Sequence, residues 1–365
     1  MKNILYLFII ALLFSSCKDD DAEITTTPEE TKSSYFPPKI GTWETTSPQS
    51  LNWNADSITS LYDNLETNGT RAFIVLKDGK IVLENYWGKD LLAVNDFDKS
   101  KNWYWASAAK TLTAFTVGKA QEQGKLELTD KSSKYLGENW TSLTKEQEDK
   151  ITVWHQLTMT TGLDDGTGNA DGWEPEDLIY KADAGTRWAY HNAPYTLLDH
   201  VIEEAVNQDF EPYFNGILRD KIGMDGFWTW SGDNHLYFST ARSAARYGNL
   251  MLNNGVWDGE RLLNKEYVDA MTTKSQDINL AYGYLWWLNG SSSFRLPQSQ
   301  IEFPGMILTD APSDVYSAMG KNGQYISVSP SEGLVVIRMG DSPDQSLVPL
   351  LYLNDIWKML GSIKN

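Results

Sequence analysis

The sequence predicts a mixed α/β (α+β) protein in which strands from both chain ends form one antiparallel sheet around an inserted helical region. Three observations predict this architecture. Residues 71–77 and 80–86 are β-rich runs on either side of Asp78-Gly79, which is a hairpin pattern. Apolar residues recur at helical spacing through the middle of the chain, and β-rich runs separated by glycine-containing turns return near its end.

The individual elements follow from periodicity and from residues that end helices or form turns. Helices are expected at 107–124, 152–160, 195–208, 240–253, 265–272 and 347–360, and late strands at 315–319, 324–328 and 334–339. The chain therefore divides into a sheet region, residues 39–100 and 280–365, and a helical region, residues 101–279. A cleft is expected between the two.

The first residues have the pattern of an export signal. Lys2 precedes eleven apolar residues, 4–14, and small residues lead to Cys17, the only cysteine of the chain. Residues 1–16 with Cys17 resemble a bacterial lipoprotein signal, although an incidental cysteine in a discarded signal is the alternative. The resemblance implies export and a lipid anchor on Cys17 to the bacterial cell envelope, at the outer membrane or cell surface. Residues 17–38, rich in Asp, Glu, Thr, Ser and Pro, are expected to be a disordered tether.

Composition narrows the possible partners. The formal net charge of -18 excludes a nucleic-acid surface, because little would neutralise phosphates. Fifteen Trp and eighteen Tyr suit a large core and also a pocket lined by rings. At 365 residues the chain can form one large domain or two closely packed subdomains.

The candidate nucleophile is Ser107. Ser107 and Lys110 are three residues apart at the start of a predicted helix, so both side chains lie on one helix face. An amine there can take the hydroxyl proton if desolvation, expected from Trp103 and Trp105, lowers the lysine pKa. The tetrapeptide alone is common, and a surface helix is the simpler interpretation of it.

A second candidate group is Tyr190-His191-Asn192. A tyrosine whose pKa is lowered by a neighbouring lysine ammonium can shuttle the same proton, and the Asn192 amide can bind both the lysine and a substrate carbonyl.

The order of these motifs is similar to that of the serine β-lactamase and penicillin-binding-protein superfamily, in its class C-like branch. The segments that carry the resemblance are TVWHQLTMTTGL at 152–163, GTRWAYHN at 185–192 and STARSAARYG at 239–248. The resemblance implies a β-lactamase/transpeptidase-like fold, an acyl-enzyme on Ser107, and Lys110 with Tyr190 as the acid–base pair. It implies no metal and no organic cofactor.

The third motif departs from that family. A literal Lys-x-Gly stands at Lys321–Gly323, but a strand ending at Gly320 favours Ala318-Met319-Gly320 in the family's Lys-Thr-Gly position. In this second register the Lys321 N–H joins the Ser107 N–H as oxyanion donor, and the family's basic residue is replaced by Ala318. Gly323-Gln324 and YLWW at 284–287 then resemble the esterase and 6-aminohexanoate-dimer hydrolase side of the branch.

The loops expected to surround the substrate pocket are 162–177, 228–234 and 291–312. The candidate pocket residues are Trp103, Trp105, Trp173, His191 and Trp286. Two other patterns are interpreted as coincidences. Glu260 imitates the deacylating glutamate of class A β-lactamases, and the acidic residues at 165–176 have nearly the spacing of a calcium loop.

The sequence therefore predicts a serine hydrolase that cleaves a small ester, an amide or a peptide-like substrate. A β-lactamase and a D-alanyl-D-alanine carboxypeptidase are the alternative enzymes. A catalytically silent envelope binding protein with the same fold is the alternative outside enzymes.

Overall fold

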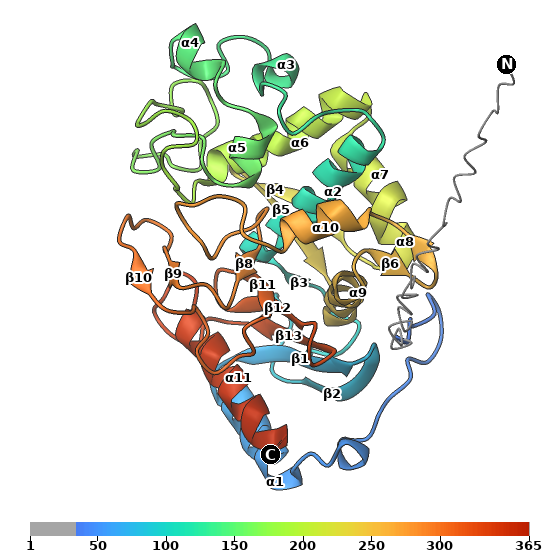
Figure 1. The fold of residues 1–365 in the computed structure, drawn as a ribbon. Helices are drawn as coiled ribbons and strands as arrows, with labels where there is room; N and C mark the ends of the chain where they lie inside the picture. Colours follow the sequence, from blue (N-terminus) through green and yellow to red (C-terminus); the bar gives the residue numbers. More distant parts are fainter. Residues whose placement is uncertain (1–33, 365) are drawn as a thin grey trace, which may run out of the picture. The chain divides into compact units, whose positions relative to one another are not determined.

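Six strands from both ends of the chain form the main sheet of the computed structural model, which describes residues 34–364 (Figure 1). The strand order is β2-β1-β13-β12-β11-β8, and all neighbours are antiparallel. The bounds are β1 (Thr70–Lys77), β2 (Lys80–Tyr86), β8 (Trp287–Leu288), β11 (Tyr316–Gly320), β12 (Gln324–Ser329) and β13 (Leu334–Gly340). The antiparallel sheet built from both chain ends is thus confirmed.

The β1–β2 hairpin turns where the sequence predicted it. Asp78 and Gly79 both have positive φ, 49° and 83°, which is the conformation that a two-residue hairpin turn requires. The Tyr35 N–H donates to the Asp78 carbonyl over 2.9 Å, so the turn is also tied to the first described residues. The hairpin therefore anchors the beginning of the fold.

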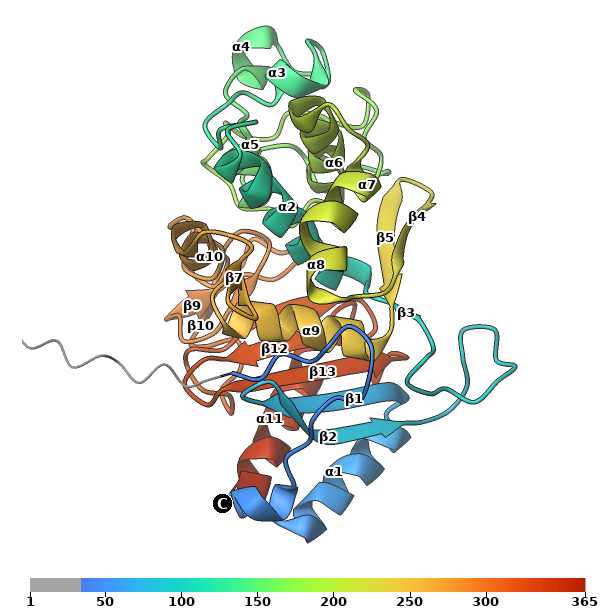
Figure 2. The ribbon, with the colours of Figure 1, turned by 90° about the vertical axis from the view of Figure 1, so that its right-hand side faces the viewer.

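Helices cover both faces of the sheet (Figure 2). On one face α1 (Ala55–Thr67) packs against α11 (Leu350–Lys364), and on the other α9 (Ala241–Leu252) packs on β1, β12 and β13. Helix α9 begins where Thr240 caps it, its side chain accepting from the Ser243 N–H. Both α9 and α11 were predicted, and α1 was not.

The inserted helical region contains the remaining helices. They are α2 (Lys110–Glu122), α3 (Ser133–Leu136), α4 (Lys145–Glu148), α5 (Val153–Leu157), α6 (Asn192–Val206), α7 (Phe210–Phe214), α8 (Asp220–Ile222) and α10 (Lys265–Met271). Short 3₁₀ turns lie at Pro48–Leu51 (η1) and Ala106–Ala109 (η2), and a π-helical turn lies at Asn215–Arg219 (η3). The predicted helices at 107–124, 152–160, 195–208 and 265–272 correspond to α2, α5, α6 and α10.

Three smaller sheets complete the fold. The sheet β3-β5-β4 joins β3 (Trp103–Tyr104) to the hairpin β4 (Phe227–Ser231) and β5 (Asn234–Ser239). The other two are the pairs β6 (Val256–Trp257) with β7 (Glu260–Arg261) and β9 (Ser293–Phe294) with β10 (Phe303–Pro304). Segment 228–234, expected as a loop, is therefore largely a hairpin, and its turn faces the cleft described below.

The fold includes residues that the sequence analysis placed in the tether. Arg246 donates to the carbonyl oxygens of Pro37 (2.9 Å) and Pro38 (2.6 Å), and the segment from Ser34 onward belongs to the compact unit. The signal at 1–16 and the lipidation at Cys17 lie outside the described residues and stay predictions. Within residues 34–364, no helix has both the length and the apolar character needed to cross a bilayer.

Helix α9 lies so close to the sheet that a glycine is required at the contact. A Cβ at Gly248 would lie 2.4 Å from the buried Val335 Cγ1 and 3.2 Å from Ile326 Cγ2. In contrast, a Cβ at Gly361 in α11 would meet no atom within 4 Å. Substitutions at these two helical glycines therefore distinguish the effect of close packing on stability from that of helix propensity.

We expect Gly248→Ala to lower the free energy of unfolding by about 1–3 kcal/mol, because the methyl group overpacks the contact between α9 and the sheet. We expect Gly361→Ala to raise it by about 0.5–1 kcal/mol through helix propensity alone. Denaturant unfolding of both variants beside the wild type measures the difference. Equal effects of the two substitutions would contradict the packing described.

Candidate active site

Ser107 lies in the turn η2, directly before α2, and the backbone there is unusual. Ala106 has φ of 48°, a left-handed conformation that a residue with a Cβ rarely adopts. Such strain persists only where the surrounding structure imposes it, and it is frequent at functional sites. The turn presents Ser107 at the cleft while Trp105 and Ala108 on either side are buried.

Lys110 begins α2, and its side chain is buried although it points to the cleft. It is 4% exposed, and its Nζ lies 3.9 Å from the centroid of the Tyr195 ring and 5.5 Å from that of Tyr190. Burial lowers the pKa of Lys110 to about 7, and the carboxylates of Asp171 and Asp199 oppose this shift. A substantial fraction of the amine is therefore unprotonated near neutral pH.

The two tyrosine rings replace the tryptophans that were expected to desolvate Lys110. The Trp103 and Trp105 side chains are buried away from the cleft, where their indole N–H groups donate to the Gly340 carbonyl (3.2 Å) and to the Ser239 hydroxyl (2.8 Å). The low polarity around Lys110 was thus anticipated, but its source was not.

Tyr190 precedes α6 and lies on the cleft wall. Burial raises its pKa above the usual value, and the interaction with the Ser107 side chain opposes the rise only in part. The expectation of a lowered tyrosine pKa was wrong, because desolvation of the Tyr190 hydroxyl outweighs the opposing hydrogen bond with Ser107. Tyr190 is therefore a neutral hydroxyl next to an amine that is partly neutral.

Asn192, the first residue of α6, contacts a different partner from the one expected. Its Nδ2 donates to Asp171 Oδ1 over 2.7 Å, and Asn234 Nδ2 donates to the other oxygen of Asp171 over 3.2 Å. The amide oxygen of Asn192 is buried and has no hydrogen-bond partner among the described residues. Asp171 therefore connects α6 to the β4–β5 turn across one side of the cleft.

The opposite side of the cleft is the turn between β11 and β12. Strand β11 ends at Gly320, and Gly320 pairs with Gln324 across a turn that contains Lys321, Asn322 and Gly323. The assignment of Ala318-Met319-Gly320 to the family's third motif stays a prediction. Lys321 lines the cleft, while Ala318 is buried in the sheet.

Close packing of Gly320 brings this turn to the nucleophile. A Cβ at Gly320 would lie 2.4 Å from the Trp105 carbonyl oxygen and 3.1 Å from the Ala108 nitrogen. Only glycine permits this approach of two backbones. The end of β11 is thereby fixed against the turn that carries Ser107.

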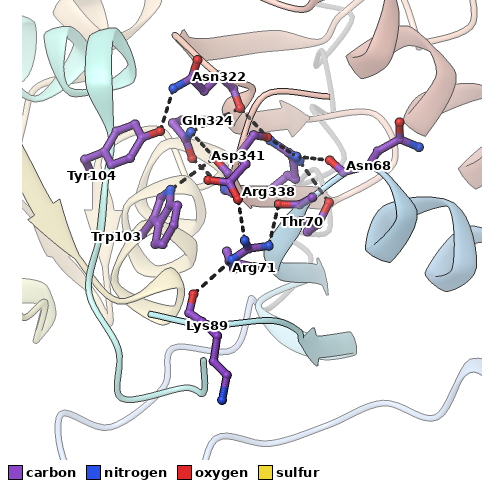
Figure 3. Close-up of polar contacts among 12 residues, drawn as sticks. Asn68, Thr70, Arg71, Lys89, Trp103, Tyr104, Asn322, Gln324, Arg338 and Asp341 are labelled. Carbon is purple, nitrogen blue, oxygen red and sulfur yellow. Dashed lines mark hydrogen bonds and ion pairs between the residues drawn. The ribbon is translucent and has the colours of Figure 1, made fainter. Parts of the chain in front are cut away.

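The buried guanidinium of Arg338 supports the same turn through hydrogen bonds (Figure 3). Arg338 is fully buried and donates to the carbonyl oxygens of Asn322 and Gly323, each over 2.8 Å. Its other hydrogen bonds go to the carbonyl oxygens of Asn68 and Asp341 and to the Thr70 hydroxyl.

Two further side chains complete this support. Gln324 Nε2 donates to the carbonyl oxygens of Lys321, Asn322 and Gly340, and Asn322 Nδ2 donates to the Tyr104 hydroxyl over 2.8 Å (Figure 3). Gln324 and Gly323 are buried and do not line the cleft, although both were candidate site residues.

These elements enclose a cleft of about 550 Å³. Ser107, Lys110, Tyr190, His191, Asn192 and Lys321 all line it. The three loops expected around the cleft each contribute, since its wall includes Asp165 with residues 168–171, the β4–β5 turn and Pro297-Gln298. Leu347 and Val348, which precede α11, also line it and were not anticipated.

Of the five candidate pocket residues, only His191 lines the cleft. Its ring is 3% exposed, and burial lowers its pKa to about 4, so it is neutral at neutral pH. Trp286 is buried in the core, and Trp173 packs in a second cluster with Trp140 and Leu178. Trp103 and Trp105 were expected at the pocket because they flank Ser107 in the sequence, but both are buried in the core.

The acidic contribution to the site was not predicted from the sequence. Asp171 was assigned to an incidental acidic loop, yet it lines the cleft and influences the Lys110 pKa. Asp199 is buried beside His235, with 2.7 Å between its Oδ2 and the His235 Nδ1, and burial raises the pKa of this carboxyl. A usable signal existed, because Asn192, Tyr195 and Asp199 have the i, i+3, i+7 spacing of one helix face.

Of the two patterns interpreted as coincidences, the one at Glu260 lies away from the cleft, whereas the acidic loop contributes Asp165 and Asp171 to the cleft wall. Glu260 is exposed on β7 and pairs with Lys221 over 2.8 Å. Within residues 34–364, no group of three or more His, Cys, Asp or Glu side chains is placed to hold a metal ion.

Comparison with known proteins places these features in a family. The family described as Beta-lactamase matches residues 63–346. The 6-aminohexanoate-dimer hydrolase of Paenarthrobacter ureafaciens is 22% identical over 333 residues, which is 80% of this chain and 77% of that protein. A Bacillus subtilis (strain 168) protein described as a penicillin-binding protein, PbpX, is 26% identical over 159 residues. That match covers 41% of this chain and only 39% of the relative.

Solved structures agree on the fold. A Bacillus anthracis protein described as a 6-aminohexanoate-dimer hydrolase superposes with a TM-score of 0.67 at 18% identity, covering 91% of this chain and 89% of that one. The mixed α/β fold is thus the β-lactamase and penicillin-binding-protein fold. Because the family match spans most of the chain, the protein belongs to the β-lactamase family.

Proposed function

We propose that the protein is a serine hydrolase that forms an acyl-enzyme on Ser107 and cleaves a small ester or amide. The observation that carries this proposal is the buried amine of Lys110, one helical turn from Ser107, with a pKa of about 7 inside a cleft of suitable size. A neutral amine can act as a base, whereas an ordinary surface lysine cannot at neutral pH.

In the proposed acylation, the Ser107 Oγ attacks the substrate carbonyl carbon while Lys110 Nζ takes the hydroxyl proton. The oxyanion is bound by the backbone N–H groups of Ser107 and Lys321, which the close packing of Gly320 supports. Tyr190 relays the proton from Lys110 to the leaving group as the C–O or C–N bond breaks. Water then cleaves the acyl-enzyme through the same groups in reverse.

Loss of the family's basic residue favours this proposal over a β-lactamase. Ala318 offers no cation for the carboxylate of a β-lactam, and its side chain is buried. Lys321, which lines the cleft, extends from the turn after this strand instead of from the strand itself.

We expect Ser107→Ala to reduce hydrolysis of p-nitrophenyl acetate by about 10³-fold or more, because no nucleophile remains. The wild type should also be labelled by a fluorophosphonate, and the variant should not be. Undiminished ester hydrolysis by a folded Ser107→Ala protein would overturn the assignment of the nucleophile.

The two tyrosines beside Lys110 form a matched pair. We expect Tyr190→Phe to lower kcat by about 10²–10⁴-fold, because the hydroxyl that relays the proton is lost. Tyr195→Phe retains the ring against Lys110 and removes only a 3.4 Å contact with Thr113, so kcat should change by less than about fivefold. Similar losses in both variants would exclude a specific role of the Tyr190 hydroxyl.

The pH dependence follows from Lys110. Because the unprotonated amine is the active form, kcat/KM should rise tenfold per pH unit below about 7 and level off above it. The Asp171 carboxylate raises the lysine pKa, so Asp171→Asn should move this ascending limb to lower pH. Asp233→Asn, in the nearby β4–β5 turn, is the control and should leave the limb in place. A limb that Asp171→Asn leaves unmoved would show that another group controls it.

A further inference from the structure

A second hollow adjoins the catalytic cleft and has a different character. It is a groove of about 430 Å³ without a charged residue in its lining. The groove is formed by these residues: Trp287, Phe294, Leu296, Pro297, Gln298, Ile307, Ser346, Leu347, Val348, Leu350 and Leu351. Its size is in the range of small-molecule sites, which are mostly apolar with few polar groups.

The groove and the cleft are continuous. Pro297, Gln298, Leu347 and Val348 line both hollows. The floor connects them as well, because the Trp287 ring stacks on the Tyr190 ring with 5.8 Å between centroids and 19° between planes. A molecule with its reactive carbonyl at Ser107 can therefore extend directly into the groove.

Two segments build the groove walls, and both are braced. One is the β9–β10 hairpin, whose Phe294 and Phe303 rings stack at 5.4 Å, and whose Gln300 Nε2 donates to the Trp188 carbonyl over 3.0 Å. The other is the segment before α11, where the Tyr325 hydroxyl donates to the Pro349 carbonyl. The apolar lining is therefore held in place before any ligand binds.

Part of the groove lining is apolar surface in contact with solvent. Leu347 is 49% exposed and Leu351 is 79% exposed. Exposed apolar side chains grouped around a hollow mark a binding surface more often than isolated ones do. Covering them with an apolar ligand would stabilise the complex by a free energy proportional to the area removed from water.

We propose that this groove binds an apolar arm of the substrate, so that the preferred substrates are esters or amides carrying an alkyl chain or ring of several carbons. The proposal rests on the proposed function, because it places the scissile carbonyl at Ser107. The continuity with the cleft favours a substrate arm over a second copy of the chain, which would have to cover the groove without entering the cleft.

A chain-length series tests the proposal. We expect kcat/KM to rise roughly fourfold for each methylene added between C2 and about C8, as each is removed from water. One series lengthens the acyl chain of p-nitrophenyl esters, and a second lengthens the alcohol of acetate esters. The series that rises identifies which side of the scissile bond occupies the groove. A flat response in both series would overturn the proposal.

Two exposed apolar residues give a matched pair of variants. Leu351→Asp places a charge in the groove lining, outside the catalytic cleft, and should flatten the chain-length response. Ile301→Asp alters a residue that is 63% exposed in the neighbouring β9–β10 hairpin but lines neither hollow, and it should leave the response intact. An unchanged slope in Leu351→Asp would contradict the assignment.

A binding measurement separates this inference from the catalytic one. Calorimetric titration of Ser107→Ala with octanamide and with butanamide should give roughly 10²-fold tighter binding of octanamide, and Leu351→Asp added to that background should abolish the difference. Tighter octanamide binding without ester turnover by the wild type would support the groove and refute the proposed hydrolysis. Equal binding of the two amides would refute the groove whatever the turnover.

Discussion

The close approach of Gly320 to the backbone of residues 105–108 is the constraint on which the site depends. It joins the end of a central strand to the turn that begins α2, and it allows no side chain between them. Arg338, Gln324 and Asn322 hold the turn after Gly320 mainly through backbone carbonyl oxygens. The position of Lys321 beside Ser107 is therefore fixed by buried hydrogen bonds of the sheet and not by contacts of exposed side chains.

Burial of Lys110 is the second determinant, and it acts on three groups at once. The rings of Tyr190 and Tyr195 exclude water from the amine, which lowers the lysine pKa to about 7 and keeps both tyrosines neutral. Asp171 and Asp199 limit the shift, because each stabilises the ammonium form. The resulting amine is near its midpoint at neutral pH, where a group can both accept and release a proton.

Much of this arrangement could be predicted from the sequence, for identifiable reasons. The hairpin, the late strands and α9 have strong local signals, and the order of Ser107, Lys110 and Tyr190 indicated one cleft. The sequence could not place the tryptophans, because burial of a ring depends on tertiary packing. It also could not show that Asp171 faces Lys110. The two residues are far apart in the sequence, and hydrophobic periodicity does not predict how the loop from 162 to 177 folds. The prediction of a lowered pKa for Tyr190 was wrong, because it considered the nearby lysine charge without the desolvation of the hydroxyl.

Under the proposed function, the two hollows suggest how the enzyme could work with alanine at position 318. The oxyanion site requires backbone N–H groups and a fixed turn, and neither depends on the side chain at position 318. A basic residue there serves an anionic substrate, whereas the continuation of this cleft is an uncharged groove lined by Trp287, Leu350 and Leu351. Exchange of a buried cation for Ala318 is consistent with a substrate whose binding energy comes from apolar contact. Under the proposed function, the catalytic groups lie in the cleft and the substrate preference is determined by the adjoining groove.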